Sequence, residues 1–179
     1  KRKGKHDAPV LVAGKHADIY ALWGETQAQV REITGRVRAA AAAHRRTVRF
    51  SLSFRPILAD TEEKAFQRAE AILARARALA EQTKFTPKQP PANRGSQRLL
   101  EAAALGTRLD KRLWTAMAAL TGAKGNSTAL VGTPEQVAEA RLDYYDLGVT
   151  TFLIRGFDPL EDAIQYGREL IPLTRKLVA

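Results

Sequence analysis

The sequence predicts an α/β fold with a parallel sheet, because apolar strand patterns alternate along it with amphipathic helix patterns. Residues 126–172 give the clearest example, since they follow the order helix, strand, helix. Residues 17–55 add two further strand patterns with a helix between them. In such folds, functional residues lie at the carboxyl ends of the strands, in the loops that lead into the next helices.

The composition is that of one globular domain: 179 residues, of which 45% are hydrophobic and 27% charged. No apolar run approaches the roughly 20 residues that span a bilayer, and no signal-peptide pattern is present, so we expect a cytoplasmic protein without membrane contact. The absence of cysteine excludes disulfides and thiol chemistry. The three histidines are not spaced as metal ligands, and nucleophile-elbow, phosphate-loop and dinucleotide motifs are missing, so we expect no metal.

A net charge of +10 raises the question of nucleic-acid binding. Most basic residues are scattered over predicted helices among glutamates, which favours a solvated surface; a steep loss of affinity with salt would support the nucleic-acid alternative. Residues 1–10 are expected to form a basic, disordered leader before a folded domain at 11–179. The basic residues of that leader are Lys1, Arg2, Lys3 and Lys5.

The first half begins with a weak helix pattern from Ala8 to His16 and an apolar strand pattern from Ala17 to Trp23. Thr26 is expected to cap the helix that follows. One face of that helix is apolar at 3.6-residue spacing, and it is made of Val30, Ile33, Val37, Ala40 and Ala41. We expect this face to cover a sheet.

Residues 48–55 alternate between apolar and polar types, which is typical of a strand with two different faces. The apolar set is Val48, Phe50, Leu52 and Phe54, and the polar set is Arg49, Ser51, Ser53 and Arg55. We expect the apolar set to face the helices, with Ser53 and Arg55, roughly 6 to 7 Å apart, pointing inward at the carboxyl end. Polar groups there need partners, so we interpret Arg55 as ligand-binding, with an internal salt bridge as the alternative.

An insertion at about residues 81–127 interrupts the repeat of strands and helices. Before it, Asp60 and Glu63 are expected to start a helix that reaches Leu79. Within it, three prolines rule out regular structure at 82–93, and helices are expected at 96–105 and 110–120. The loop at 121–127 carries two glycines around its lysine, and such insertions are commonly lids or binding loops.

The last segment has two capping signals. Thr133, Pro134 and Gln136 start a helix that Gly148 ends, and Asp158, Pro159 and Glu161 start another. Between them, residues 149–157 form a short apolar run that predicts a strand covered on both faces. The strand end is made of Arg155, Gly156, Phe157 and Asp158. A surface or ion-paired role for Arg155 and a core role for Phe157 remain as alternatives to ligand binding.

Four segments together resemble a known family: ADIYALWGET, VRFSLSFRPILADTEEKAFQRAEAIL, RLWTAMAALTGAKGNSTALVGTPEQV and LGVTTFLIRGFDPLEDAIQYGRELIPL. They resemble the carboxyl-terminal half of the bacterial-luciferase-like, flavin-dependent monooxygenases, in the alkanesulfonate monooxygenase branch. The resemblance runs from about Val12 to the last helix. It implies part of a (β/α)8 TIM-type barrel, in which the three predicted strands correspond to the sixth, seventh and eighth.

The resemblance also implies reduced FMN supplied by a separate flavin reductase, and O2 as a co-substrate that oxidises an alkanesulfonate-like or related small molecule. Three strands cannot close a barrel, and the loop after the fifth strand that holds the FMN phosphate in this family has no counterpart in KRKGKHDAPV. We therefore expect a piece of a larger enzyme, or a truncated homologue that pairs with a complementing half-barrel or with itself, and weak FMN binding by the chain alone. The alternative is a non-catalytic assembly or binding module.

Site residues follow from the resemblance position by position. Ser53 and Arg55 match a family arginine and histidine on the seventh strand, Lys124 matches a mobile-loop arginine, and Phe157 matches a tyrosine. At each of these positions the residue type differs from that of the family. The differences keep cations at the barrel mouth but remove the family's acid and base groups. The residues expected to be catalytic are Arg55 and Lys124, and those expected to bind the cofactor are Trp23, Ser53, Arg155 and Phe157.

Overall fold

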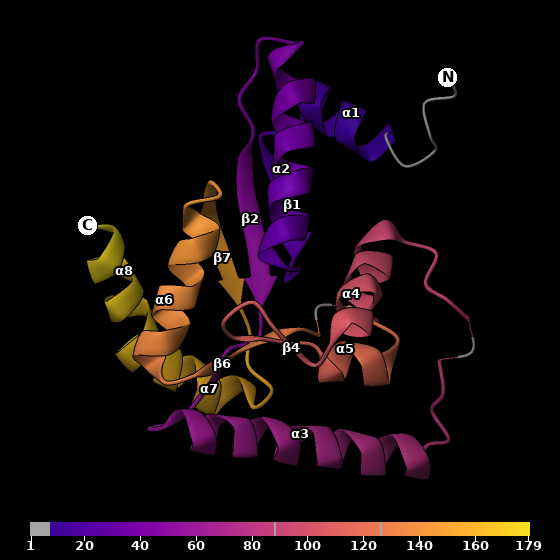
Figure 1. The fold of residues 1–179 in the computed structure, drawn as a ribbon, viewed down its shortest axis with the longest axis vertical. Coiled ribbons are helices and arrows are strands. Elements are labelled where there is room, and N and C mark those ends of the chain that lie inside the picture. Colours follow the sequence, from indigo (N-terminus) through magenta and orange to yellow (C-terminus); the bar gives the residue numbers. More distant parts are fainter. Residues whose placement is uncertain (1–7, 88, 126) are drawn as a thin grey trace.

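A three-stranded parallel sheet forms the centre of the computed structural model, which describes residues 8–87, 89–125 and 127–179 (Figure 1). Its strands are β1 (Ile19–Trp23), β2 (Arg49–Phe54) and β7 (Val149–Ile154), in the spatial order β1-β2-β7. Trp23 lies opposite Ser53, and Ser53 lies opposite Leu153. The three predicted strands therefore form one sheet, which does not close into a barrel.

Helices cover one face of this sheet. They include α1 (Ala8–His16), α2 (Gln27–Ala42), α6 (Pro134–Tyr145), the π-helical turn η1 (Tyr166–Leu170) and α8 (Ile171–Val178). Between β7 and η1, α7 (Pro159–Gln165) lies beyond the carboxyl end of β7 (Figure 1). The apolar set of β2, expected to face them, is buried with the apolar stripe of α2 in one core. The alternation of apolar and polar residues along β2 thus decides which face of the sheet the helices cover. Among the described residues, no helix combines the length and the apolar composition that a membrane span requires.

The opposite face of the sheet is largely bare. Ile19, Ala21 and Thr151 are exposed on it, and Leu153 is 61% exposed. The prediction of a last strand covered on both faces is therefore wrong for β7, because within the described part of the chain nothing buries Thr151 and Leu153 on this face. An apolar run alone does not distinguish these two environments.

A second, four-stranded sheet follows the carboxyl end of β2. Its strands are β3 (Ile57–Leu58), β6 (Ala129–Gly132), β5 (Leu113–Trp114) and β4 (Arg108–Leu109), in that spatial order. Around it lie α3 (Glu62–Gln82), α4 (Arg94–Leu105) and α5 (Ala116–Thr121). Figure 1 shows α3 running across this end of the molecule.

The helix predicted at 110–120 is correct only from Ala116 onward. Asp110 has a left-handed backbone (φ 48°), which turns the chain between β4 and β5. Leu113 and Trp114 then pair with Leu130 and Ala129 of β6. Pairing with a distant segment therefore overrides the local helix pattern.

The helix starts agree with the capping signals in three cases of four. Thr26 and Thr133 cap α2 and α6 in full capping boxes. The expected cap Asp60 is wrong, because Thr61 caps α3 by accepting a hydrogen bond from the Lys64 amide. Asp158 occupies the position before α7 with Pro159 in the first turn, as predicted, although its side chain makes no capping hydrogen bond.

The folded part of the chain begins slightly earlier than predicted. Residues 8–10 of the expected leader form the first turn of α1, and the rest of that leader, with its basic residues, lies outside the described residues. The described part of the proline-rich stretch between α3 and α4 has no regular structure.

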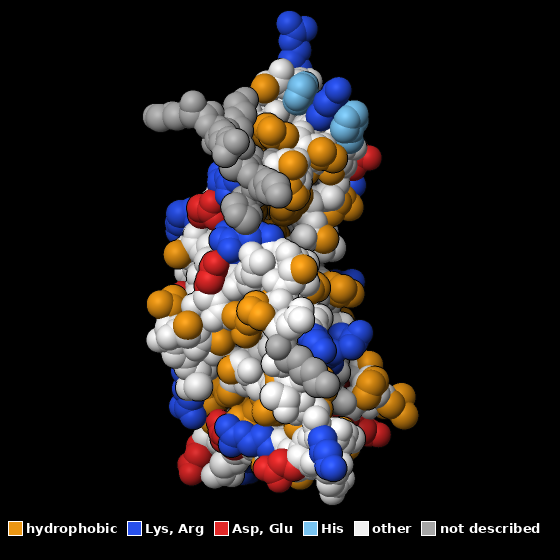
Figure 2. Space-filling model, turned by 90° about the vertical axis from the view of Figure 1, so that its right-hand side faces the viewer, with side chains coloured by type: hydrophobic (Ala, Val, Ile, Leu, Met, Phe, Trp, Pro, Cys, Tyr) orange, Lys and Arg blue, Asp and Glu red, His pale blue; other side chains and the backbone are white. Residues whose placement is uncertain are grey.

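On the face drawn in Figure 2, lysine and arginine side chains lie in several separate groups with acidic side chains among them.

Candidate functional site

The carboxyl ends of β2 and β7 meet at Arg55. Its Nη1 donates a hydrogen bond to the Gly156 carbonyl at 2.7 Å, and its guanidinium lies 5.0 Å from the centre of the Phe157 ring. The backbone joins the same two strand ends, since the Arg155 amide donates to the Phe54 carbonyl at 3.3 Å. Three of the predicted site residues, Arg55, Arg155 and Phe157, are therefore neighbours.

Positive charge accumulates at this corner. Burial lowers the pKa of Arg55, and the nearby charge of Arg155 lowers it further. Arg55 is half-buried and held by a carbonyl and a ring, whereas the Arg155 side chain is exposed. The arrangement can stabilise an anion near the strand ends, because a fixed guanidinium outside bulk water interacts strongly with negative charge.

The loop that carries Phe157 is held by Asp162 of α7. Its carboxylate accepts hydrogen bonds from the Phe157 amide at 2.8 Å and the Asp158 amide at 3.0 Å, and it forms an ion pair with Arg68 of α3. Only 2% of Asp162 is exposed. Sequence reasoning missed this residue and assigned the capping role to Asp158 instead.

Trp23 and Ser53 lie opposite each other at the ends of β1 and β2. Ser53 is buried, and the Trp23 ring packs on α4, where a Cβ added to Gly95 would lie 3.2 Å from its Cε3 atom. Trp23 also packs against a small apolar cluster that contains Leu99. The insertion therefore covers part of the Trp23 ring.

Lys124 belongs to a different neighbourhood. Its Nζ atom lies 5.1 Å from the centre of the Phe85 ring, in the proline-rich stretch, and its side chain is exposed. The structure groups Lys124 with Phe85, and its described contacts do not include Arg55 or Phe157. Its predicted catalytic role stays a prediction.

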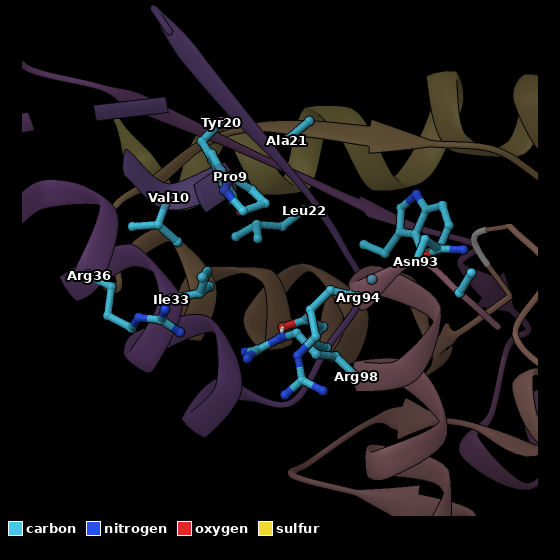
Figure 3. A pocket seen from close by; sticks show the side chains of 14 residues that line it. Pro9, Val10, Tyr20, Ala21, Leu22, Ile33, Arg36, Asn93, Arg94 and Arg98 are labelled. Atoms are coloured by element: carbon cyan, nitrogen blue, oxygen red, sulfur yellow. Dashed lines mark hydrogen bonds and ion pairs between the residues drawn. The ribbon is translucent and has the colours of Figure 1, made fainter. Parts of the chain in front are cut away.

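A cavity of about 540 Å³ runs along the outer edge of β1 and ends at Trp23 (Figure 3). It is bounded by parts of α1, β1, α2 and α4. Figure 3 shows apolar side chains around it, including Val10, Leu22 and Ile33, together with arginine side chains. Its arginines are Arg36, Arg94 and Arg98.

Glu25, two residues after the end of β1, supplies the one carboxylate among the described residues that line this cavity, and it is 1% exposed. It accepts a hydrogen bond from Arg98 Nε at 2.7 Å, and Arg98 Nη1 reaches Glu32 at 2.8 Å. Burial raises the pKa of Glu25, although Arg98 opposes the shift. For Arg98, burial acts to lower the pKa, but the two carboxylates more than offset it, so the pKa is raised.

This network ties the insertion to the strand ends. Arg98 Nη2 donates to the Gln29 carbonyl at 2.7 Å, and the Gln29 side chain donates back to the Arg98 carbonyl at 2.9 Å. Tyr144 of α6 donates its hydroxyl to the Glu25 carbonyl at 2.9 Å. The position of Glu25 directly after an apolar strand was the only signal in the sequence, and it does not identify Arg98 as the partner.

Comparison with known proteins gives a family match over most of the chain. The family model described as luciferase-like monooxygenase matches residues 4–151. Among solved structures, riboflavin lyase RcaE, solved with modified FMN and riboflavin, is 22% identical with a TM-score of 0.66, over 94% of this chain and 41% of its own. DmoA from Hyphomicrobium sulfonivorans is 20% identical with a TM-score of 0.65, over 99% of this chain and 41% of its own.

EDTA monooxygenase EmoA from Chelativorans sp. BNC1 is 21% identical with a TM-score of 0.62, over 98% of this chain and 45% of its own. At these identities the likeness shows a shared fold. The chain thus has the fold of part of a luciferase-like TIM barrel, and it spans less than half the length of the structures that it matches.

Proposed function

Because the chain belongs to the luciferase-like monooxygenase family, we propose that it supplies the carboxyl-terminal strand ends of an active site that uses reduced FMN and O2. The proposed substrate is a small organic molecule of the alkanesulfonate type or a related one. A separate flavin reductase would be the partner that supplies the reduced FMN. Bound reduced flavin would provide the electrons for O2 activation, and the residues of this chain would bind and orient the reactants.

The observation that carries the proposal is the contact of Arg55 with Gly156 and Phe157. It fixes a half-buried cation where two parallel strands end, which is where barrels of this type carry their active sites. A phosphate, a sulfonate or negative charge formed during oxidation would be stabilised there. Arg155 adds a second positive charge, which favours an anionic ligand over a neutral one.

The fit to an aromatic anion such as FMN rests on the types of side chain present. Trp23 and Phe157 offer ring surfaces at the ends of β1 and β7, and Ser53 offers a hydroxyl between them in the strand order. We propose that these three residues and Arg155 contact the flavin, and that Arg55 and Lys124 stabilise negative charge. Phe157 has no hydroxyl and arginine does not give up its proton, so the chemistry assigned to these residues is electrostatic.

FMN titration tests the proposal, with flavin fluorescence as the readout. We expect the chain to bind FMN weakly and riboflavin more weakly still, because riboflavin lacks the phosphate. Arg55→Gln should weaken FMN binding at least tenfold, whereas the control Arg31→Gln, at an exposed position of α2, should not. Equal FMN binding by both variants would contradict the role of Arg55.

Catalysis requires a second assay. The chain would be mixed with a polypeptide that carries the first five strands of a relative, together with FMN, NADH, a flavin reductase and a panel of small sulfonates. We expect O2 consumption that depends on both the substrate and the reductase. If neither flavin quenching nor such O2 consumption occurs with any sulfonate, the monooxygenase assignment fails.

A second candidate function is a non-catalytic assembly module. It is supported by the two outer strands of the described sheet, β1 and β7, each of which pairs there with one neighbour, and by the bare sheet face around Leu153. Sedimentation over a concentration series distinguishes it, because an assembly module should associate with itself or with a complementing half-barrel. A monomer at all concentrations, alone and mixed, would count against this function.

A further inference from the structure

One peptide group connects Arg55 to a buried carboxylate. The Gly156 carbonyl accepts a hydrogen bond from Arg55 Nη1 at 2.7 Å, and the Phe157 amide donates to Asp162 Oδ2 at 2.8 Å. This carbonyl and this amide belong to the same peptide unit. Because the two groups of a trans peptide point in opposite directions, the guanidinium lies at one end of the unit and the carboxylate at the other.

The charges at the two ends favour one orientation of this peptide. The amide end of a peptide dipole is positive and the carbonyl end is negative, so the unit is aligned favourably between Asp162 and Arg55. If the peptide turned over, its carbonyl would face the carboxylate and its N–H would face the guanidinium. Both charge-assisted hydrogen bonds would then be lost. Asp162 therefore holds the Gly156 carbonyl toward Arg55.

Other contacts fix the Asp162 side chain itself. The Asp158 amide donates to the same Oδ2 atom at 3.0 Å, and Arg68 of α3 forms an ion pair with Oδ1. Arg68 Nη1 also donates to the Leu58 carbonyl at 3.0 Å and to the Gln165 side chain at 3.4 Å. The Asp162 side chain is 3% exposed, so these hydrogen bonds are shielded from bulk water and are strengthened by it.

Gly156 allows the carboxylate to come this close. A Cβ added to Gly156 would lie 2.2 Å from both the Cβ and the Oδ2 atoms of Asp162, so a larger residue would displace the carboxylate. Phe157 follows directly, and its ring centre lies 5.0 Å from the Arg55 guanidinium. The turn that Asp162 holds thus provides both a carbonyl and a ring to Arg55.

A simple helix cap explains only part of this arrangement. Asp158 is the residue before α7, and a carboxylate in the first turn that accepts from its amide is a common way to begin a helix. The second bond of Asp162, to the Phe157 amide, is made within the connection that leads to α7. Phe157 lies outside the helix, so a cap does not require this bond, whereas the orientation of the Gly156 carbonyl does.

We propose that Asp162 is a positioning residue, whose carboxylate fixes the Gly156–Phe157 peptide and thereby holds Arg55 in the orientation that binds an anion. The proposal rests on the proposed function, because it takes Arg55 as the cation that meets the flavin or the substrate. Arg68 extends the connection to α3, since it pairs with the same carboxylate. All of these groups belong to the described part of the chain, so the chain can be tested alone.

The first test uses the ¹⁵N-labelled chain without any ligand and follows the Nε–H signal of Arg55. Asp162→Asn removes the negative charge with little change in size, and an asparagine can also donate to a peptide that has turned over. We expect this variant to shift the Arg55 signal. The matched control is Asp158→Asn in the same turn, where the carboxylate lies 3.6 Å from the exposed Arg75, and it should leave the Arg55 signal in place.

The second test measures FMN binding by flavin fluorescence. Asp162→Asn should weaken binding about fivefold, because Arg55 loses its fixed orientation, and Asp158→Asn should change it less than twofold. In the Arg55→Gln background, Asp162→Asn should add less than a twofold effect, since Asp162 acts through Arg55. A purely structural role of Asp162 would instead weaken binding equally in both backgrounds.

The outcomes separate this proposal from the proposed function. An unchanged Arg55 signal in Asp162→Asn overturns the positioning role, even if Arg55→Gln weakens FMN binding as expected. Equal effects of Asp162→Asn in the two backgrounds overturn it as well. If the chain and Arg55→Gln bind FMN equally, the proposed function fails, and the Arg55 signal still decides the positioning role.

A second variant covers the case in which Asp162→Asn does not fold. Arg68→Lys keeps the charge opposite Asp162 but loses the planar fork, so the carboxylate is held less firmly. We expect a smaller shift of the Arg55 signal than in Asp162→Asn. The matched control is Arg75→Lys on the same helix, which should leave the signal in place. An Arg55 signal that is the same in Arg68→Lys and Arg75→Lys would overturn the proposal.

Discussion

Arg98 of α4 and Glu25, two residues after the end of β1, form an ion pair of 2.7 Å in which both side chains are buried. The two residues are 73 positions apart, so the pair connects the insertion to the strand ends. Arg98 and Glu25 also line the cavity that ends at Trp23. The position of the insertion over the candidate site therefore depends on a buried charge interaction as well as on the packing of Trp23 against Gly95.

The first prediction concerns this pair. Arg98→Met should lower the free energy of unfolding by about 3 kcal/mol, because it leaves the Glu25 carboxylate buried without its partner. Urea unfolding followed by circular dichroism gives the value. The matched control is Arg94→Met on the same helix, whose ion pair with Glu101 is exposed, and it should cost less than about 1 kcal/mol. Equal costs would show that the buried pair has no special role.

The second prediction is a pH dependence. The folded-state pKa of Glu25 is raised, first by burial and then by Glu32, despite Arg98. The folded chain therefore binds the Glu25 proton more tightly than the unfolded chain, whose glutamate pKa is about 4.3. The contribution of Glu25 to stability should rise as the pH falls from 7 toward 5, and Glu25→Gln should remove this gain. Urea midpoints of both proteins at several pH values test it, and a constant difference between them would contradict it.

The parallel sheet was predictable from the sequence because its signals are local. Alternation over residues 48–55 fixes which side of β2 is apolar, and the capping boxes of Thr26 and Thr133 fix two helix starts. The strands β3 and β5 have only two residues each, and β6 has four. They exist because distant segments pair, which no local pattern reports.

Some contacts of the candidate site could likewise be predicted from the sequence, and others could not. The meeting of Arg55 with Phe157 follows from adjacent parallel strands, since their carboxyl ends lie at the same edge. The ion pair of Glu25 and the contacts of Asp162 depend on side chains from other elements, which the sequence pattern did not bring together.

The third prediction tests the close packing at the end of β1. A Cβ added to Gly24 would lie 2.3 Å from the Phe54 ring and 2.5 Å from the Thr128 hydroxyl, so Gly24→Ala should destabilise the fold by about 1–3 kcal/mol. Gly35 of α2 is the matched control, because a Cβ there meets no atom within 4 Å. Gly35→Ala should stabilise the chain by roughly 0.5–1 kcal/mol through helix propensity. Thermal and urea unfolding measure both, and similar effects of the two substitutions would refute the packing argument.

The last prediction concerns Arg141 of α6, a buried arginine that donates to the Thr174 hydroxyl at 2.9 Å and lies 4.6 Å from the centre of the Phe152 ring. Arg141→Met should raise the free energy of unfolding by about 1–2 kcal/mol, because it replaces a buried, unoffset cation by an apolar side chain of similar length. Thr174 would keep its hydrogen bond to Leu170, so the substitution leaves no unpaired hydroxyl. Arg31→Met on the exposed face of α2 should change stability by less than about 0.5 kcal/mol. If Arg141→Met instead lowers stability, the contacts with Thr174 and Phe152 outweigh the cost of burial, and Arg141 is satisfied within the chain.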